Sequence, residues 1–347
     1  MLAYTYKTKG TFKLEEKPVP EILSPTDAIV RVTLSSICTS DLHIKHGSVP
    51  RAVPGITVGH EMVGVVEKVG AAVTNVAPGD RVTVNVETFC GECFFCRNGW
   101  VNNCENENGG WALGCRIDGG QAEYVRVPLA NQGLNRIPDS VTDRQALFVG
   151  DVLATGYWAA KISDIKEQDT VLIIGAGPTG IILAQLLRRA GAGRMVIADP
   201  HADKLDILRK YGFTDLVVMD KADPSKHTAE IKAIMPKGFD IVIDATGAAS
   251  VFESCFHFVH MGSKIVAYGV CAADAKVPVS PYDIFSQEYT ILGSFAQTHC
   301  FGRALEYLES GAVQVKELIS HELPLEDYGK GLDYIVQKQA RKVIIHP

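Results

Sequence analysis

The hydrophobic pattern of the chain changes near residue 150. Before that point, short apolar runs rich in β-branched residues are separated by tight turns that contain Gly and Pro, such as APGD at 77–80. Short alternating runs of this kind are typical of strands. They predict strands at 28–37, 62–70, 80–86 and 122–128. The first part of the chain is therefore predicted to be mainly β.

After residue 150, continuous apolar strands alternate with amphipathic helices. The strands are predicted at 170–175, 194–199, 215–220, 239–247, 263–270 and 290–295. Strands and helices that alternate in this way predict βαβ units and a parallel sheet covered on both faces. We therefore expect an α/β fold, with a doubly wound six-stranded domain at 152–295. Residues 1–151 and 296–347, with a helix near 300–311 and a terminal strand, are assigned to the other domain.

Composition agrees with two ordinary globular domains. The chain has 347 residues, of which 46% are hydrophobic and 21% charged, and a chain of this length exceeds the usual size of a single core. The formal net charge of -6 and the lack of a long basic run argue against nucleic acid or an anionic membrane as a partner. No segment has the pattern of a signal peptide or of a bilayer span. We expect a cytoplasmic protein.

The turn GAGPTG follows a predicted strand and precedes a predicted helix. Gly175 permits the sharp turn, Gly177 lets backbone N–H groups approach a pyrophosphate, and Gly180 permits close packing of helix and strand. The N-terminus of the helix offers further N–H groups to the phosphates. The alternative is a glycine-rich turn without a ligand, but the strand–turn–helix context favours a dinucleotide site. Its expected cofactor-binding residues are Gly175, Gly177, Pro178, Thr179 and Gly180.

Asp199 ends the next predicted strand, 24 residues after Gly175. A carboxylate at this position accepts hydrogen bonds from the ribose hydroxyls and repels a 2′-phosphate. Asp199 therefore favours NAD(H) over NADP(H), although an aspartate in an ordinary turn is the alternative. Lys204, five residues later, is a second candidate ribose contact, although lysines on helix surfaces are usually only solvated.

Four cysteines in FCGECFFCRNGWVNNC (89–104) follow the spacing C-x2-C-x2-C-x7-C. Disulfides need an oxidising compartment, which nothing else in the sequence supports. Zinc bound tetrahedrally by four thiolates explains the spacing better, and four thiolates leave no coordination position for a substrate. We predict a structural zinc site with the ligands Cys90, Cys93, Cys96 and Cys104. Three other thiols are expected to be core residues: Cys115, Cys255 and Cys271.

Several short motifs occur in one order along the chain: CTSDLH (38–43), GHEMVGVVEKVG (59–70), PGDRV (78–82), the four-cysteine loop and GAGPTG. Together they resemble the zinc-dependent alcohol dehydrogenases of the medium-chain dehydrogenase/reductase family, over essentially the full length. The resemblance implies a GroES-like catalytic domain interrupted by a Rossmann domain.

The resemblance also implies a catalytic zinc ion held by Cys38, His60 and Asp151. Glu61 would be an occasional fourth ligand, and Asp41 would hold the His60 ring through the ring nitrogen that does not bind the metal. Taken singly, each of these residues has an ordinary structural explanation, and spacing alone does not bring them together. An aspartate at position 151 resembles the secondary-alcohol branch, although that branch lacks the four-cysteine loop and prefers NADP.

Further roles follow from the same resemblance. Ser40 would accept the proton of the alcohol, and His43 would pass it toward water. Among the expected cofactor contacts, Thr39 would meet a phosphate, Thr155 would lie near the nicotinamide, and Lys342 or Arg341 would reach the pyrophosphate. A solvated basic pair is the alternative for the last two. Three further residues are candidates for the border of the substrate pocket: His46, His299 and Cys300.

Three functions are compatible with these features. The first is a zinc-dependent alcohol dehydrogenase that transfers hydride reversibly between NAD and an alcohol, with a ketone formed from a secondary alcohol and an aldehyde from a primary one. The second is a polyol, amino-alcohol or hydroxysteroid dehydrogenase on the same scaffold. The third is a non-enzymatic structural relative, which would not require the ligand set or Ser40 and His43. The family usually pairs its Rossmann sheets edge to edge, so the apolar segment 290–295 predicts a homodimer or homotetramer.

Overall fold

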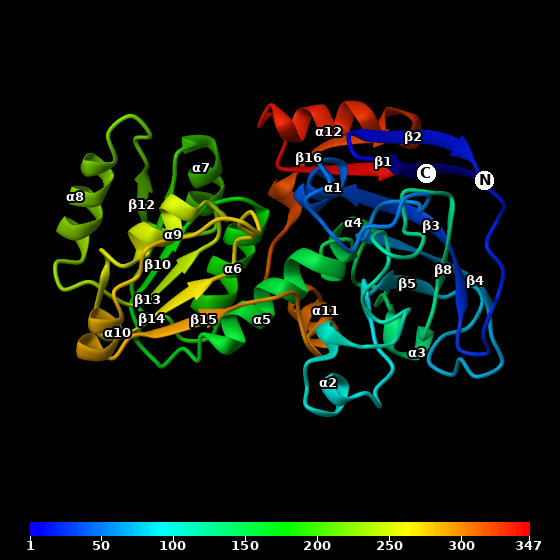
Figure 1. The fold of residues 1–347 in the computed structure, drawn as a ribbon, viewed down its shortest axis with the longest axis horizontal. Coiled ribbons are helices and arrows are strands. Elements are labelled where there is room, and N and C mark those ends of the chain that lie inside the picture. Colours follow the sequence, from blue (N-terminus) through cyan, green and yellow to red (C-terminus); the bar gives the residue numbers. More distant parts are fainter. The chain divides into compact units, whose positions relative to one another are not determined.

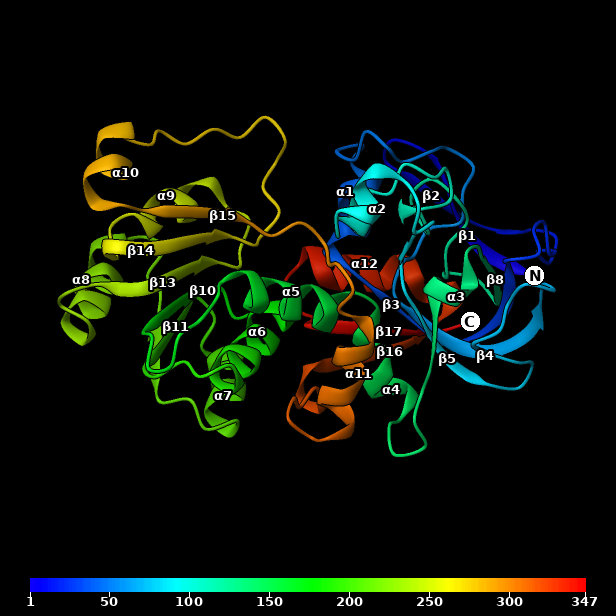
Figure 2. The same cartoon turned by 90° about the horizontal axis from the view of Figure 1, so that it is seen from below.

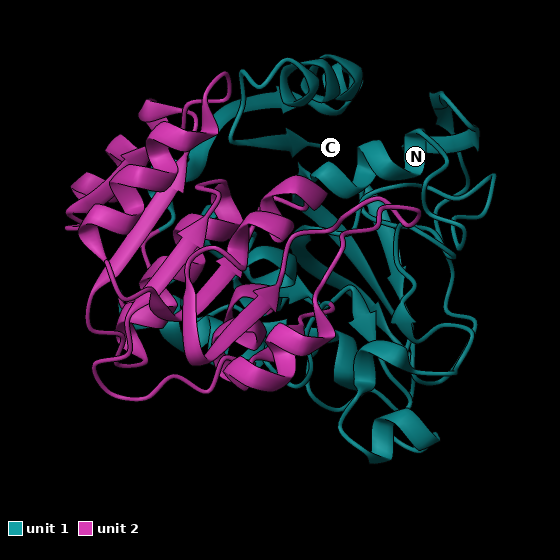
Figure 3. Cartoon of the chain, turned by 60° about the vertical axis from the view of Figure 1, so that its left-hand side comes forward, with its two compact units in different colours: residues 1–154, 296–311, 315–347 teal, residues 155–295, 312–314 magenta.

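The computed structural model describes residues 1–347, which form two compact units. Unit 1 comprises Met1–Ala154, Ala296–Gly311 and Val315–Pro347, and unit 2 comprises Thr155–Phe295 and Ala312–Gln314 (Figure 3). The C-terminal tail therefore rejoins the unit in which the chain begins.

Unit 2 is built on six parallel strands in the order β12-β11-β10-β13-β14-β15 (Figure 1). This is the doubly wound order 3-2-1-4-5-6 of dinucleotide-binding folds, and it confirms the predicted fold class. The central strands are apolar and buried because helices cover both faces. The bounds are β10 Val171–Ile174, β11 Met195–Asp199, β12 Asp215–Val218, β13 Phe239–Asp244, β14 Val259–Ala267 and β15 Thr290–Gly293.

The helices of unit 2 cover this sheet from two sides. In Figure 2, α6 and α7 lie below the sheet, and α9 and α10 lie above it. Three of the helices, α6, α8 and α10, begin with Pro, whose fixed φ angle suits the first helical position. The bounds are α5 Ala154–Ile162, α6 Pro178–Arg189, α7 Ala202–Lys210, α8 Pro224–Ile234, α9 Ala249–Cys255 and α10 Pro281–Gln287.

Unit 1 is mainly β, as predicted. Its main sheet has the order β16-β17-β3-β4-β5-β9, with β8 also paired to β3. The terminal strand β17 pairs antiparallel with β3, which ties the tail to the first part of the chain. The bounds are β3 Ala28–Ile37, β4 Met62–Val69, β5 Arg81–Val84, β8 Tyr124–Val127, β9 Leu134–Arg136, β16 Ile319–Pro324 and β17 Lys342–His346.

Two small two-stranded sheets complete the β structure of unit 1, and the sequence pattern predicted neither of them. They pair β1 Leu2–Thr8 with β2 Thr11–Glu16 and β6 Glu87–Thr88 with β7 Gly110–Trp111. The strands of the second sheet are too short to have a detectable periodicity. The strand predicted at 80–86 is also shorter in the structure, where β5 ends at Val84.

The helices of unit 1 are short. Their bounds are α1 Thr39–Lys45, α2 Phe94–Arg97, α3 Ala130–Gly133, α4 Asp143–Ala146, α11 Phe301–Glu309 and α12 Tyr328–Val336, with 3₁₀ turns at Val101–Asn103, Lys316–Leu318 and Leu325–Asp327 and a π-helical turn at Val149–Leu153. Across both units, none of the helices combines the length and the apolarity that a bilayer span requires.

Candidate functional site

Four potential metal ligands come together in unit 1. Cys38 lies at the N-cap of α1, His60 and Glu61 directly precede β4, and Asp151 lies in the π-helical turn. One ligand atom from each of the four lies within 4.8 Å of the others. Folding thus brings together residues that are up to 113 positions apart in the sequence.

The π-helical turn positions Asp151. In this turn the Leu153 N–H donates a hydrogen bond to the Phe148 carbonyl oxygen, five residues earlier in the chain, over 2.8 Å. One Asp151 carboxylate oxygen, Oδ2, lies 3.7 Å from Cys38 Sγ and 3.7 Å from His60 Nε2. Single π-helical turns recur at functional sites because they redirect one side chain out of the regular helical register.

The His60 ring is buried among acidic groups. Neither of its nitrogens has a hydrogen-bond partner, and the residue is 1% exposed. Burial alone lowers the pKa of His60, but Asp151, Cys38 and Asp41 outweigh burial and raise this pKa well above its ordinary value. The acidic groups around His60 thus favour a positive charge at this position. Thiolate, imidazole and carboxylate donors together suit Zn²⁺, so these residues fit the metal.

Glu61 and Lys342 form a buried ion pair beside this cluster. The Lys342 ammonium lies 2.7 and 2.6 Å from the two Glu61 carboxylate oxygens, and the Ser36 hydroxyl donates to the same carboxylate. The structure thus differs from the expectation that Lys342 reaches the pyrophosphate. Lys342 begins the buried strand β17, and its ammonium is already engaged by Glu61. Its neighbour Arg341 donates instead to the Glu317 carbonyl.

The other candidates on α1 surround Cys38. The Ser40 hydroxyl oxygen lies 3.6 Å from Cys38 Sγ. His43 is half-buried, and burial, followed by the charge of His46, lowers its pKa, so that His43 is neutral at pH 7. Thr39 is exposed. The segment therefore offers a hydroxyl beside the ligand cluster and a neutral imidazole one helical turn away.

An acidic residue near this cluster, Glu87, is not predicted from the sequence. Glu87, in β6, is 1% exposed and has one carboxylate oxygen without a partner. Burial raises the pKa of Glu87 well above its ordinary value, and the charge of Asp151 adds to the effect. In the two-stranded sheet β6-β7, Glu87 pairs with Trp111, whose ring meets the His60 ring edge to face at 5.4 Å between centroids. Glu87 lies in a strand of two residues, Glu87–Thr88, and belongs to no sequence motif that could have identified it.

The three candidate residues for the border of the substrate pocket differ in exposure. His46 and His299 are exposed, whereas Cys300 is buried. The His299 ring packs edge to face against Phe89, with 5.2 Å between the ring centroids. This contact places the start of the tail beside the four-cysteine loop.

The four predicted zinc ligands of that loop also converge. Their sulfur atoms lie within 4.8 Å of one another, with Cys90 and Cys104 3.5 Å apart, and all four thiols are free. Backbone N–H groups of Glu105 and Cys96 lower the pKa of Cys93 to about 6. Four sulfurs at this separation fit a tetrahedral zinc ion.

The glycine turn of unit 2 lies between β10 and α6. A Cβ atom on Gly180 would lie 2.0 Å from the Gly175 carbonyl oxygen, so only glycine fits there. At Gly177, by contrast, a Cβ atom would meet no heavy atom nearer than the Thr179 hydroxyl at 4.0 Å. Backbone N–H groups are thus left accessible above Gly177, as a pyrophosphate requires.

Asp199 closes β11 beside the same turn. Its carboxylate accepts hydrogen bonds from the Ala176 and His201 N–H groups, each over 2.8 Å. The Lys204 ammonium lies 3.8 Å from this carboxylate. The other candidate in this unit, Thr155, is hydrogen-bonded to Tyr268 over 3.1 Å between the hydroxyl oxygens.

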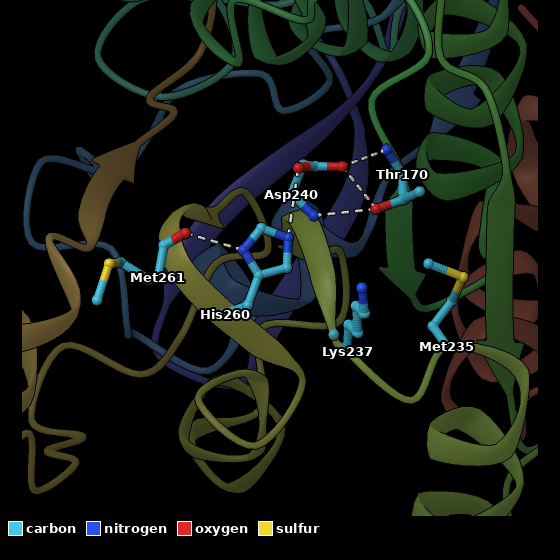
Figure 4. A pocket seen from close by; sticks show the side chains of 7 residues that line it. Thr170, Met235, Lys237, Asp240, His260 and Met261 are labelled. Carbon is cyan, nitrogen blue, oxygen red and sulfur yellow. Dashed lines mark hydrogen bonds and ion pairs between the residues drawn. The ribbon is translucent and has the colours of Figure 1, made fainter.

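A cavity of about 390 Å³ lies at the amino ends of the strands β10, β13 and β14, whereas the glycine turn lies at the carboxyl end of β10 (Figure 4). At this cavity the Asp240 carboxylate accepts hydrogen bonds from the Thr170 N–H and hydroxyl groups and lies 3.3 Å from His260 Nε2. Ligands of doubly wound sheets bind at the carboxyl ends of the strands. This cavity is therefore not the predicted dinucleotide site.

Comparison with known proteins matches both units to described families. Residues 24–139 match the alcohol dehydrogenase GroES-like domain, and residues 178–310 match the zinc-binding dehydrogenase family. D-arabinitol dehydrogenase 1 of Uromyces fabae is 36% identical over 100% of this chain and 97% of its own length. An alcohol dehydrogenase of Cupriavidus necator is 31% identical over 100% of this chain and 99% of its own. Among solved structures, alcohol dehydrogenase TADH from Thermus sp. ATN1 has a TM-score of 0.89 and 30% identity, with 100% of this chain and 99% of that chain covered.

Proposed function

The chain belongs to the zinc-dependent alcohol dehydrogenases of the medium-chain dehydrogenase/reductase family, and on that premise we propose that it transfers hydride reversibly between a secondary alcohol and NAD. As a member it is an oxidoreductase that acts on a small molecule with zinc and a nicotinamide cofactor. The observation that carries the proposal is the cluster of Cys38, His60, Glu61 and Asp151, in which the His60 nitrogens are buried without partners.

Cys38, His60 and Asp151 would hold the catalytic zinc, and Glu61 would act as an occasional fourth ligand. Zinc bound there supplies a Lewis acid that makes an alcohol hydroxyl acidic near neutral pH. Ser40, beside Cys38, would accept the hydroxyl proton as it releases its own, and His43, neutral because of its lowered pKa, would carry the released proton toward water. A nicotinamide cofactor held by unit 2 would supply the hydride acceptor, and the secondary alcohol would become a ketone.

NAD is supported over NADP by Asp199. The carboxylate is held beside the glycine turn by the Ala176 N–H, and a fixed negative charge there disfavours a 2′-phosphate. Gly175, Gly177, Pro178, Thr179 and Gly180 would cradle the pyrophosphate. Additional cofactor contacts are proposed for Thr39, Thr155 and Lys204.

A second, structural zinc ion would occupy the four-cysteine loop. Zinc there stabilises the loop without taking part in the chemistry, because four thiolates complete its coordination. Cysteines kept as metal-binding thiolates fit a reducing compartment, so we place the protein in the cytoplasm.

Polyols are the second substrate class. Their support is the relative named D-arabinitol dehydrogenase 1, which is 36% identical over the whole of this chain. A polyol offers the same secondary alcohol group, so the chemistry at the ligand cluster is unchanged.

A homodimer or homotetramer is proposed from the edge of unit 2. The strand β15 pairs with β14 on one side only, and apolar Ile291, Tyr282 and Phe285 are exposed on β15 and the nearby helix α10. An apolar edge strand is a site at which sheets of two copies can pair. Light scattering of the parent and of Ile291→Lys tests this, since a lysine in the edge should favour the monomer.

The experiment that tests the function combines metal analysis with a substrate panel. We expect the purified protein to hold two zinc ions per chain and to reduce NAD with secondary alcohols or polyols, followed by NADH absorbance. The variant His60→Ala should lose one of the two ions together with its turnover, whereas His227→Ala, a buried histidine in unit 2, should keep both. An active parent with a single ion, held by the four cysteines, would contradict the proposal.

A further inference from the structure

Among the buried polar atoms of unit 1 that lack hydrogen-bond partners are His60 Nδ1, Asp41 Oδ1 and the Tyr328 hydroxyl. The three residues are at most 1% exposed, so water does not satisfy these atoms. Buried polar groups are paired in nearly all folded proteins. Three orphaned atoms in one buried region therefore call for an explanation.

The three groups complement one another chemically. A carboxylate only accepts hydrogen bonds, whereas an imidazole N–H and a phenol O–H donate them. Asp41 Oδ1 lies 3.7 Å from His60 Nδ1, and Asp41 Oδ2 already accepts from the Cys38 N–H over 3.0 Å. One carboxylate oxygen thus remains for two donors, the imidazole and the Tyr328 hydroxyl.

Tyr328 is close to Asp41 and is held in place by its neighbours. Its pKa is raised well above the ordinary value, first by burial and then by Asp41. The ring begins α12 and packs against Tyr4 at 4.7 Å and Phe12 at 6.2 Å between ring centroids. The aromatic cluster of Tyr4, Phe12 and Tyr328 therefore fixes the position from which the hydroxyl can reach the carboxylate.

We propose that Tyr328 is a positioning residue for the catalytic metal. In the metal-loaded protein, the Tyr328 hydroxyl donates a hydrogen bond to Asp41 Oδ1, and the same oxygen accepts a second hydrogen bond from His60 Nδ1–H. The His60 ring is thereby held with Nε2 toward the metal. The inference rests on the proposed function, because it requires a metal ion among Cys38, His60 and Asp151. A group that accepts a hydrogen bond from the other ring nitrogen of a metal-ligating histidine fixes the tautomer and the orientation of the ring. Loss of such outer contacts typically weakens metal affinity 10–100-fold.

The test compares two tyrosines of one aromatic cluster. Tyr328→Phe removes the hydroxyl that faces Asp41. Tyr4→Phe removes a neighbouring hydroxyl that donates to the Glu326 carbonyl oxygen and serves as the matched control. Zinc release from the loaded protein to a chelating dye is followed for both variants and the parent, without substrate. The four-cysteine site is common to all three, so a difference in rate reports the other site.

We expect Tyr328→Phe to release zinc roughly 10-fold faster than the parent, which is the low end of the range for such groups. Tyr4→Phe should release it at the parental rate. In an Asp41→Asn background, Tyr328→Phe should add little, because the hydroxyl acts through Asp41. Equal release from Tyr328→Phe and Tyr4→Phe, or fully additive effects with Asp41→Asn, would overturn the role of Tyr328. A parent with zinc only in the four-cysteine loop would instead overturn the proposed function.

Discussion

Replacing Lys342 by methionine removes one partner of the buried ion pair with Glu61. The side chains of Lys342 and Glu61 are 5% and 1% exposed, and the ammonium lies within 2.7 Å of both carboxylate oxygens. Methionine fills a similar volume, so the main change is electrostatic. Glu61 is left as a buried carboxylate whose remaining side-chain partner is the Ser36 hydroxyl.

The expected loss of unfolding free energy is large. Breaking a buried pair by removing one partner costs about 3–5 kcal/mol, because the other charge stays buried without compensation. The Lys342 ammonium also lies 6.0 Å from the centroid of the Phe148 ring, but a cation–π contact contributes only about 0.5–2 kcal/mol. The uncompensated carboxylate therefore dominates. Folded domains are stable by only about 5–15 kcal/mol, so the variant should be close to unfolding.

Urea unfolding followed by fluorescence and circular dichroism measures this loss, in zinc-loaded and zinc-stripped protein. The double variant Glu61→Gln with Lys342→Met should recover much of it, since an amide is far less costly to bury than a carboxylate. A loss below about 1 kcal/mol for Lys342→Met, the value typical of an exposed pair, would refute the reasoning. So would equal instability of the single and double variants.

Three further predictions concern other sites. Asp199→Ala should raise the KM for NAD roughly 10-fold, because a hydrogen bond from the ribose to this carboxylate is worth about 1.5–3 kcal/mol. It should also raise the ratio of NADP to NAD turnover, and initial rates with both cofactors measure both effects. Cys104→Ser should lower the zinc content by one ion per chain, whereas Cys255→Ser, whose buried thiol is outside both clusters, should leave it unchanged by elemental analysis. A hydrogen bond from Arg144 lowers the pKa of Glu322 from 4.5 to about 2, so this pair stabilises the fold above pH 4.5 and loses its effect as the pH falls toward 2. Glu322→Gln should therefore cost at most about 1 kcal/mol at pH 7, and urea unfolding should show this difference vanish over that pH range.

Much of the α/β unit could be predicted from the sequence. Its central strands are buried on both faces, so each appears in the sequence as a continuous apolar run. Such a run can be recognised without knowing which strands lie beside it. The glycine turn is equally local, because the close approach of Gly180 to the Gly175 carbonyl arises within six consecutive residues. The four cysteines also signal their site within one loop of 15 residues, from Cys90 to Cys104.

The environment of the catalytic cluster was decided by the tertiary structure. Lys342 reaches Glu61 because β17 pairs with β3, across 281 positions of sequence. Glu87 and Tyr328 carry no motif and acquire their significance only through burial beside Asp151 and Asp41. Periodicity and spacing report contacts among residues that are near in sequence. The charge balance of a buried site instead depends on which distant strands and helices pack around it, and only the folded chain specifies that.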